Sequence, residues 1–404
     1  MSHIPVPAHA GGRAGSFDPA APPPALFLAA DEWASLADRL EDPFFAALHR
    51  RNLALLDAYL RGETDLRRRS GGLLSVRVVK NLVQRGAVAW HITGRPRYAD
   101  LAVETLLDAC RRSWEPIADH RVRGIRYADL GTGEMMYIVS FGLEALHDRL
   151  PLEQRRACVR ALLENGMARY FAGVDGQDWW VRCDFNWNSA LHGNAGIAAL
   201  AVRAHAPEPA RRALETARNG LRCMTDAYLQ GGGWTEGLMY FGTATGHLTD
   251  FARAHERALG NDLGVLTNRN LHESIDFALD MHGADGRAYN FSNCPARPGG
   301  WVRPFVFWYA DRLRRPDWAA DQQRKIEAGA LDDLRSLFTD IDCFWYRRPF
   351  QPTIAPPVQH GVRHFEGIDW LRWRGPRSWL AFRSGYSGGN HNNSDLGQFI
   401  FGLD

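Results

Sequence analysis

The sequence has few cysteines, a small net charge and no long apolar run. Its 404 residues contain six cysteines and no CxxC pair, so neither a zinc ribbon nor a redox dithiol is expected. The net charge is +2 and no basic run alternates with aromatic residues, so nucleic acid is not an expected partner. No stretch of about 18 apolar residues occurs, and no membrane span is expected.

The first residues lack the marks of a signal peptide. Residues 1–24 are rich in Ala, Gly and Pro, with no apolar stretch behind a basic start. We expect residues 1–30 to form an N-terminal extended segment. Cysteines that read as small buried thiols favour a reducing compartment. Together these features predict a cytoplasmic rather than a periplasmic protein.

Residues 31–338 show helix after helix. Apolar side chains recur at helical spacing, and glycines followed by a proline or an asparagine mark the helix ends. One such apolar set is Val103, Leu106, Leu107, Cys110 and Trp114. We expect roughly ten to twelve helices, each burying one apolar stripe. No repeat of fixed period indicates a solenoid, so a closed ring of helical hairpins, an (α/α) toroid, is the preferred architecture.

Residues 339–404 show strand signals instead. Short aromatic or alternating runs, separated by Pro and Gly, predict strands. The runs are 344–346, 370–373, 379–383 and 398–402. A sheet of three or four strands with an open edge is a poor place for a domain to end, so we expect the natural protein to continue beyond residue 404.

A first polar and aromatic cluster spans residues 179–194. It holds Trp187, Asn186, Asn188 and His192, and we expect a helix to begin near Ser189. Asparagine donates hydrogen bonds to a carboxylate without carrying charge, and a tryptophan face is a flat apolar platform for a sugar ring. The alternative, an N-cap beside core aromatics, explains one Asn but not the set.

Two further clusters could carry chemistry. Residues 231–242 form a Gly-rich loop with Trp234 and Glu236, and Tyr240 follows at the expected start of a helix. A tyrosine acts as acid or base only if its pKa, about 10, is lowered or a proton shuttle exists. Residues 390–399 place His391 and Asp395 four apart after a flexible Gly loop. The alternatives are a core or rim tyrosine and a polar turn.

The order of these clusters resembles the heparinase II/III-like polysaccharide lyases, which include alginate and oligoalginate lyases. The motifs are Asn-Trp-Asn at 186–188, Gly-Gly-Trp-x-Glu-Gly-x-x-Tyr at 232–240 and His-x-x-x-Asp-x-Gly-x-Phe at 391–399. Residues 24–33 also resemble the approach of that family to its first helix, so the likeness covers nearly the whole chain. It implies an incomplete (α/α) toroid followed by the beginning of an antiparallel β-sandwich, and β-elimination on a uronate-containing polysaccharide or oligosaccharide.

The resemblance also implies roles for the site residues. Asn186 would neutralise the substrate carboxylate, supported by Asn188 and His192. Tyr240 would be the general acid, and also the base where both protons lie on one face. His391 would be the base or a second neutralising group. The remaining predicted substrate-binding residues are Trp187, Trp234, Glu236 and Asn390, with Glu236 expected to orient the Gly loop rather than to react.

One departure concerns a metal. Many relatives carry a second histidine where this chain has Asn393, a poor zinc ligand. No cofactor is therefore expected to be required, and Asp395 is the residue of the motif that a structural divalent ion such as zinc would use.

Two other functions stay open at this point. A glycoside hydrolase on the same toroid would need two carboxylates, for which Glu236 and Asp184 could be proposed, but the Asn, Tyr and His set would then have no role. A non-catalytic carbohydrate-binding protein of surface polysaccharide metabolism is the second alternative. The sequence predicts no oligomeric state.

Overall fold

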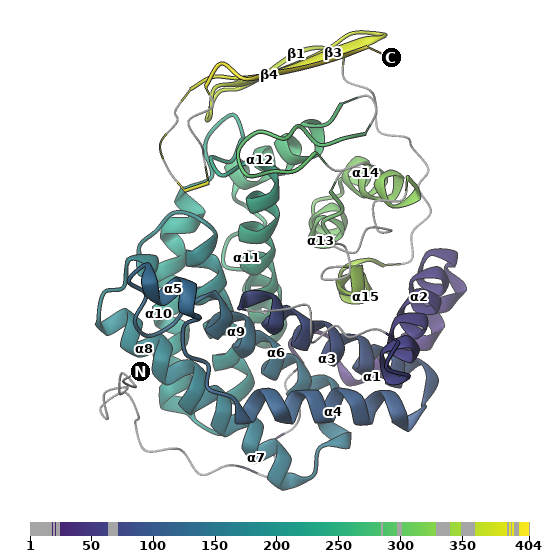
Figure 1. Ribbon diagram of the computed structural model, residues 1–404, viewed down its shortest axis with the longest axis vertical. Coiled ribbons are helices and arrows are strands. Elements are labelled where there is room, and N and C mark those ends of the chain that lie inside the picture. Colours follow the sequence, from purple (N-terminus) through teal and green to yellow (C-terminus); the bar gives the residue numbers. More distant parts are fainter. Residues whose placement is uncertain are drawn as a thin grey trace. The chain divides into compact units, whose positions relative to one another are not determined.

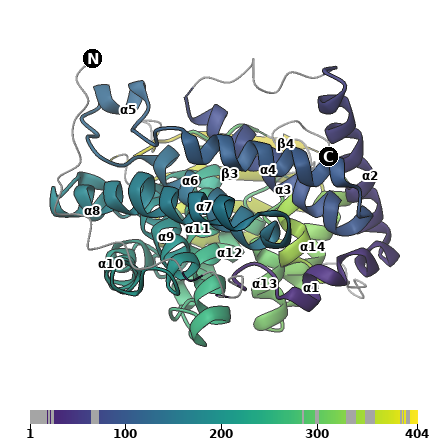
Figure 2. The same ribbon diagram turned by 90° about the horizontal axis from the view of Figure 1, so that it is seen from below.

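A computed structural model gives the fold (Figures 1 and 2). The structure describes residues 18, 21, 25–63, 72–283, 286–296, 301–328, 340–348, 360–385, 388, 390–391 and 396–403. The chain divides into two compact units. The first comprises residues 1–183, 187–221 and 250–263, and the second comprises residues 184–186, 222–249 and 264–404.

The first unit is helical. Its helices are α1 (Ala30–Ala34), α2 (Pro43–Leu60), α3 (Leu73–Thr93), α4 (Pro96–Arg111), α5 (Ala118–Val122), α6 (Leu130–Ala145), α7 (Leu152–Ala161) and α8 (Ala168–Asp175), with most of α9 (Asn186–Val202) and α10 (Pro207–Asp226). Gly94, with φ 65°, ends α3 in the left-handed conformation, and Pro96 begins α4 at once. The two helices pack closely, because a Cβ on Gly86 of α3 would lie 2.7 Å from the Tyr98 carbonyl oxygen of α4.

A buried carboxylate ties the segment before α1 to α6. Glu144 accepts hydrogen bonds from the backbone N–H groups of residues 26–28, at 2.8 Å for Leu28, and from Trp33 Nε1 at 3.1 Å. Burial raises the pKa of Glu144 to about 7, although these four donors act to lower it. Glu144 therefore holds residues 26–28, which lead into α1, against α6.

The second unit combines helices with one sheet. It contains the end of α10, the first half of α11 (Gly237–Leu259), α12 (Arg269–Asp280), α13 (Phe305–Arg312), α14 (Pro316–Glu327) and α15 (Cys343–Tyr346). The expected strand at 344–346 is wrong, since these residues lie in α15. Their three side chains are all buried. A strand would point alternate side chains to opposite faces, whereas a helical turn lets this aromatic run pack into one core.

The sheet is antiparallel in the order β1 (Gly361–Phe365), β2 (Trp370–Arg374), β3 (Ser378–Arg383) and β4 (Phe399–Leu403). The three later strands confirm the predicted runs, and β1 is an additional one. Phe365 and Trp370 on one face pack against Phe277 of α12, with ring centroids 4.9 and 5.7 Å away. In Figure 1 the yellow sheet lies beside the end of α12.

The other face of the sheet is apolar and exposed. The registered pairs place Val362, Trp373, Leu380 and Phe401 in one row across the four strands. Val362 is 69% exposed and Phe401 is 55% exposed. A second row on the same face runs through residues 364, 371, 382 and 399.

A single aspartate joins the packed face of the sheet to α12. Asp280 accepts a hydrogen bond from Arg372 Nε at 2.9 Å and lies 3.7 Å from Arg363 and 3.9 Å from Arg374. Arg372 is 1% exposed, so this ion pair is buried.

Among the helices that the structure describes, none is long and apolar enough to cross a lipid bilayer.

Candidate active site

The Gly-rich loop before α11 is close-packed against protein. Gly231, Gly232 and Gly233 have φ values of 81°, 78° and 117°. A Cβ on Gly232 would lie 2.6 Å from the Glu273 carbonyl oxygen, and one on Gly233 would lie 2.6 Å from Ile368. The backbone of this loop therefore lies close to α12 and to the turn between β1 and β2. Gly231 N–H also donates to the Glu273 carboxylate at 2.8 Å.

Glu236 joins two of the predicted site asparagines. Its Oε1 accepts hydrogen bonds from Asn186 Nδ2 at 3.0 Å and from Asn390 Nδ2 at 2.9 Å. Its Oε2 accepts the backbone N–H of Asn186 at 3.1 Å. Glu236 is 1% exposed. We name this set of three side chains, Asn186, Glu236 and Asn390, the clasp.

Burial dominates the electrostatics of Glu236. Burial, with a smaller contribution from the charge of Asp184, raises the pKa of the carboxyl to about 7. The hydrogen bonds from Asn186 and Asn390 act in the opposite direction. A carboxyl group with a pKa near neutrality, surrounded by amide donors, is typical of a functional site.

Tyr240 and His391 lie ring on ring. Tyr240 is in the first turn of α11, as the sequence predicted, and its ring stacks on the His391 imidazole with centroids 3.7 Å apart and planes 9° apart. Asn293 Nδ2 lies 2.8 Å from His391 Nδ1. With the Asn293 amide nitrogen as donor, Nδ1 is the acceptor, which is its role in the imidazole tautomer that carries the proton on Nε2.

The backbone around His391 is unusual. His391 and Ser292 both have positive φ, 56° and 60°. Non-glycine residues rarely adopt this region, and such conformations gather at functional sites. A Cβ on Gly237 would lie 3.0 Å from both Phe291 and Ser292, so the start of α11 packs directly on the loop that carries Asn293.

The remaining residues of the Asn-Trp-Asn cluster lie in the first unit and bond to protein. His192 is fully buried, and its ring lies 2.6 Å from the Tyr170 hydroxyl and 3.1 Å from the Val181 carbonyl oxygen. Burial lowers the pKa of His192 to about 4. Asn188 Nδ2 also donates to Val181, at 3.2 Å. Both side chains hold the turn that precedes α9, which begins at Asn186, three residues before the expected start.

The two predicted tryptophans, Trp187 and Trp234, are buried, whereas a platform for a sugar ring needs an exposed ring face. Trp234 is 1% exposed and packs against Tyr228 with ring centroids 5.2 Å apart, so its ring lies in the core. Trp187 is 8% exposed and lies 4.9 Å from Trp179. Trp179 is 45% exposed and is the tryptophan of this cluster with an open ring.

The metal prediction concerns Asp395, in the motif that also contains Asn393. Both residues lie outside the described part of the chain. Within the part of the chain that the structure describes, no three His, Cys, Asp or Glu side chains gather as metal ligands.

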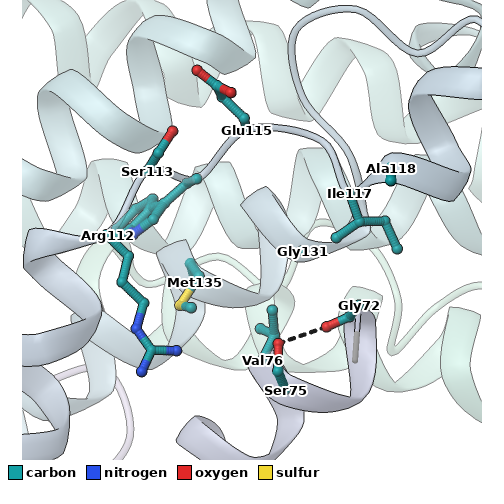
Figure 3. Close-up of a pocket in the computed structure, with 11 residues that line it drawn as sticks. Gly72, Ser75, Val76, Arg112, Ser113, Glu115, Ile117, Ala118, Gly131 and Met135 are labelled. Atoms are coloured by element: carbon teal, nitrogen blue, oxygen red, sulfur yellow. Dashed lines mark hydrogen bonds between the residues drawn. The ribbon is translucent and has the colours of Figure 1, made fainter. Parts of the chain in front are cut away.

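Figure 3 shows a cavity of about 300 Å³ in the first unit. It is lined by the start of α3, by residues 112–115, 117 and 118, and by Gly131 and Met135 of α6, with Arg112 and Glu115 as its charged side chains. Ser75 Oγ donates to the Gly72 carbonyl oxygen at its edge. None of the predicted site residues is among those that line it.

Sequence reasoning missed two features of this site. Asn293 is not among the site residues predicted from the sequence, and only its contact with His391 brings it into the site. The pairing of Glu236 with both asparagines was not foreseen either. The polar run Asn290-x-Ser-Asn was the available signal for the first, and the motif offered none for the second.

Comparison with solved structures gives polysaccharide lyases. A xanthan lyase from Paenibacillus aligns over 93% of this chain and 40% of its own, with a TM-score of 0.57 and 10% identity. A chondroitin AC lyase from Streptomyces coelicolor A3, in complex with chondroitin sulphate, aligns over 96% of this chain and 55% of its own, with a TM-score of 0.51 and 14% identity. A heparinase III aligns over 82% of this chain and 49% of its own, with a TM-score of 0.49 and 11% identity.

The matches to the xanthan lyase and the chondroitin AC lyase confirm the predicted fold class, an (α/α) toroid followed by an antiparallel β-sheet. The chain spans about half the length of these structures or less. No family model and no curated protein sequence matches it.

Proposed function

We propose that this protein is a polysaccharide or oligosaccharide lyase that cleaves uronate-containing glycans by β-elimination. The observation that carries the proposal is the stacked pair of Tyr240 and His391, with Asn293 on the histidine. The fold and the order of the sequence motifs support it. The substrate class is an acidic glycan, in agreement with a site whose polar side chains are mostly neutral donors.

The chemistry begins with the substrate carboxylate. The C5 proton of a uronate becomes removable when hydrogen-bond donors neutralise the negative charge that spreads into that carboxylate. Asn186 is proposed to supply one donor from its side-chain amide, whose orientation Glu236 sets. His391 is proposed to supply another through Nε2–H, because its Nδ1 accepts from Asn293.

Proton transfer then falls to Tyr240. With His391 acting as a donor, Tyr240 is proposed to take the C5 proton as the phenolate and to return it to the leaving glycosidic oxygen. The bond from C4 to that oxygen breaks as the C4–C5 double bond forms. Tyr240 ends in the state in which it began, and no outside reactant is consumed.

The hydrolase alternative has less support. Glu236 would have to be one of two catalytic carboxylates, yet it is 1% exposed and accepts three N–H groups. Asp184, its suggested partner, is exposed. A carbohydrate-binding protein without turnover would bind glycans and release no product.

The deciding experiment is a product assay on alginate, heparan, hyaluronan and related oligosaccharides. Elimination creates a conjugated double bond that absorbs ultraviolet light, and hydrolysis does not. We expect absorbance to rise with at least one uronate glycan and not after Tyr240→Phe. New reducing ends without absorbance would favour the hydrolase, and binding without either product would favour the binding protein.

The cytoplasmic location also stays a prediction. Fractionation of cells that make the native protein tests it.

A further inference from the structure

We infer that Glu236 is a positioning residue that orients Asn186 and Asn390 together and thereby sets the geometry of the Tyr240–His391 pair. The inference rests on the proposed function for its catalytic consequence. Its structural part rests on the clasp alone.

The first step is the selectivity of a carboxylate. The amide of an asparagine can present either its oxygen or its nitrogen, and the two orientations have nearly the same shape. An ionised carboxylate accepts hydrogen bonds and donates none, so it selects the nitrogen of Asn186 at 3.0 Å and of Asn390 at 2.9 Å. Each amide then has a defined orientation, with its nitrogen toward Glu236 and its oxygen away from it.

The second step is the backbone contact. Glu236 Oε2 also accepts the backbone N–H of Asn186, the first residue of α9. The first N–H groups of a helix have no partner within the helix, and an acidic side chain there satisfies one of them. Glu236 therefore holds both the backbone and the side chain of Asn186.

The third step is chain connectivity. Glu236 lies directly before α11, and Tyr240 follows in the first turn of that helix. Asn390 is the neighbour of His391, whose backbone has φ 56°. The hydrogen bond between Glu236 and Asn390 thus joins a residue four positions before Tyr240 to the residue directly before His391. It offsets part of the cost of the left-handed backbone at His391.

The state of Glu236 should control the clasp. Protonation turns one carboxyl oxygen into a donor and leaves the other as the acceptor, so the group can no longer accept all three N–H groups equally. Burial and the charge of Asp184 raise the pKa of Glu236 to about 7, so the change falls in the range where the enzyme would be assayed. The hydrogen bonds from Asn186 and Asn390 oppose this rise.

The test uses the full chain and three variants, Glu236→Gln, Asn390→Ala and their combination. Glu236→Gln keeps the shape but replaces one of the two accepting oxygens with an NH2 donor, so the three N–H groups of the clasp cannot all be accepted. The matched control is Glu273→Gln, because Glu273 also accepts a backbone N–H beside this loop, that of Gly231, and touches neither asparagine in the clasp.

We expect Glu236→Gln to lower kcat about tenfold to a hundredfold with a smaller change in KM, since a misplaced group loses rate more than binding. Asn390→Ala should cost a similar factor, and the double variant should lose no more than the worse single one, because both remove the same contact. The wild-type kcat should rise with pH through about 7, and Glu236→Gln should lose that limb. Glu273→Gln should stay within about twofold of wild type.

Activity equal to wild type in Glu236→Gln, or losses that multiply in the double variant, would overturn the inference. Multiplying losses would instead assign Asn390 a separate contact with substrate. A readout without turnover separates this result from failure of the proposed function. Hydrogen exchange of the peptide that contains residues 390–391 should be faster in Glu236→Gln than in wild type or Glu273→Gln, and equal exchange would also overturn the inference.

Discussion

The aromatic ring of Tyr240 lies flat on the imidazole of His391, with centroids 3.7 Å apart and planes 9° apart. The two residues come from the first turn of α11 and from the segment that precedes β4. Parallel stacking restricts the rotation of both side chains, and Asn293 fixes which nitrogen of the histidine bears the proton. A tyrosine held beside a donor is the arrangement that the proposed elimination requires.

Removal of the Tyr240 hydroxyl gives the first prediction. Tyr240→Phe keeps the stacked ring and should lower kcat about 10²- to 10⁴-fold, the usual contribution of a general acid or base. Ultraviolet absorbance of the product measures it. The control is Tyr228→Phe, which removes a buried hydroxyl bonded to Thr245 at 2.8 Å and should cost about 1 kcal/mol of stability with cleavage retained. Full activity in Tyr240→Phe would reject the mechanism.

A second prediction concerns Asn293. In Asn293→Asp a carboxylate faces Nδ1 of His391 in place of an amide donor, and it favours the doubly protonated, charged imidazole. The pH dependence of kcat/KM should then move to higher pH wherever it reports this histidine. Asn293→Ala should lower the rate without that displacement. If both variants keep the wild-type profile, Asn293 does not act through His391.

The buried ion pair between α12 and the sheet gives a third prediction. Asp280→Asn leaves the buried Arg372 without its counter-charge and should cost about 3–5 kcal/mol of unfolding free energy. Chemical denaturation measures the loss. Asp317→Asn breaks a pair with Arg315 in which both side chains are 37% exposed, and it should cost about 0–1 kcal/mol. Equal losses in the two variants would contradict this assignment.

Glu144 predicts how stability depends on pH. Its folded-state pKa is raised from 4.5 to about 7, so the native state holds a proton that the unfolded state has released between these values. The contribution to stability is complete below pH 4.5 and is lost as pH rises through about 7. The unfolding free energy should therefore fall across this interval, and Glu144→Gln should flatten the fall. A Glu144→Gln profile as steep as that of wild type would contradict the prediction.

The exposed sheet face gives a fifth prediction. Val362, Trp373 and Phe401 form an apolar surface of the kind that binds hydrophobic dyes or other apolar surfaces. Val362→Thr with Phe401→Ser should lower the fluorescence of a bound dye such as anilinonaphthalene sulfonate. Leu74→Ser, at an isolated residue that is 48% exposed, should leave it unchanged. No difference between these variants would mean that the face is not accessible in solution.

Much of the fold follows from local patterns. Helical periodicity predicted the helices of residues 31–328, and alternation predicted β2, β3 and β4, because both depend on side chains a few residues apart. The aromatic run at 344–346 failed for the opposite reason. Three adjacent aromatic residues fit a strand or a buried helical turn equally well, and only the core around α15 decides between them.

The site divides in the same way. The sequence by itself determined that Asn186, Tyr240 and His391 belong to three motifs. The order of these motifs resembles that of the heparinase II/III-like lyases, and residue type and spacing carry that information. Only the tertiary structure placed Tyr240 against His391, gave Asn293 and Glu236 their partners, and put the rings of Trp234 and His192 in the interior. It also brought the sulfurs of Cys110 and Cys158 within 3.8 Å. The physical reason is that burial and hydrogen bonding depend on chain segments far apart in sequence, whereas a motif records only its own neighbours.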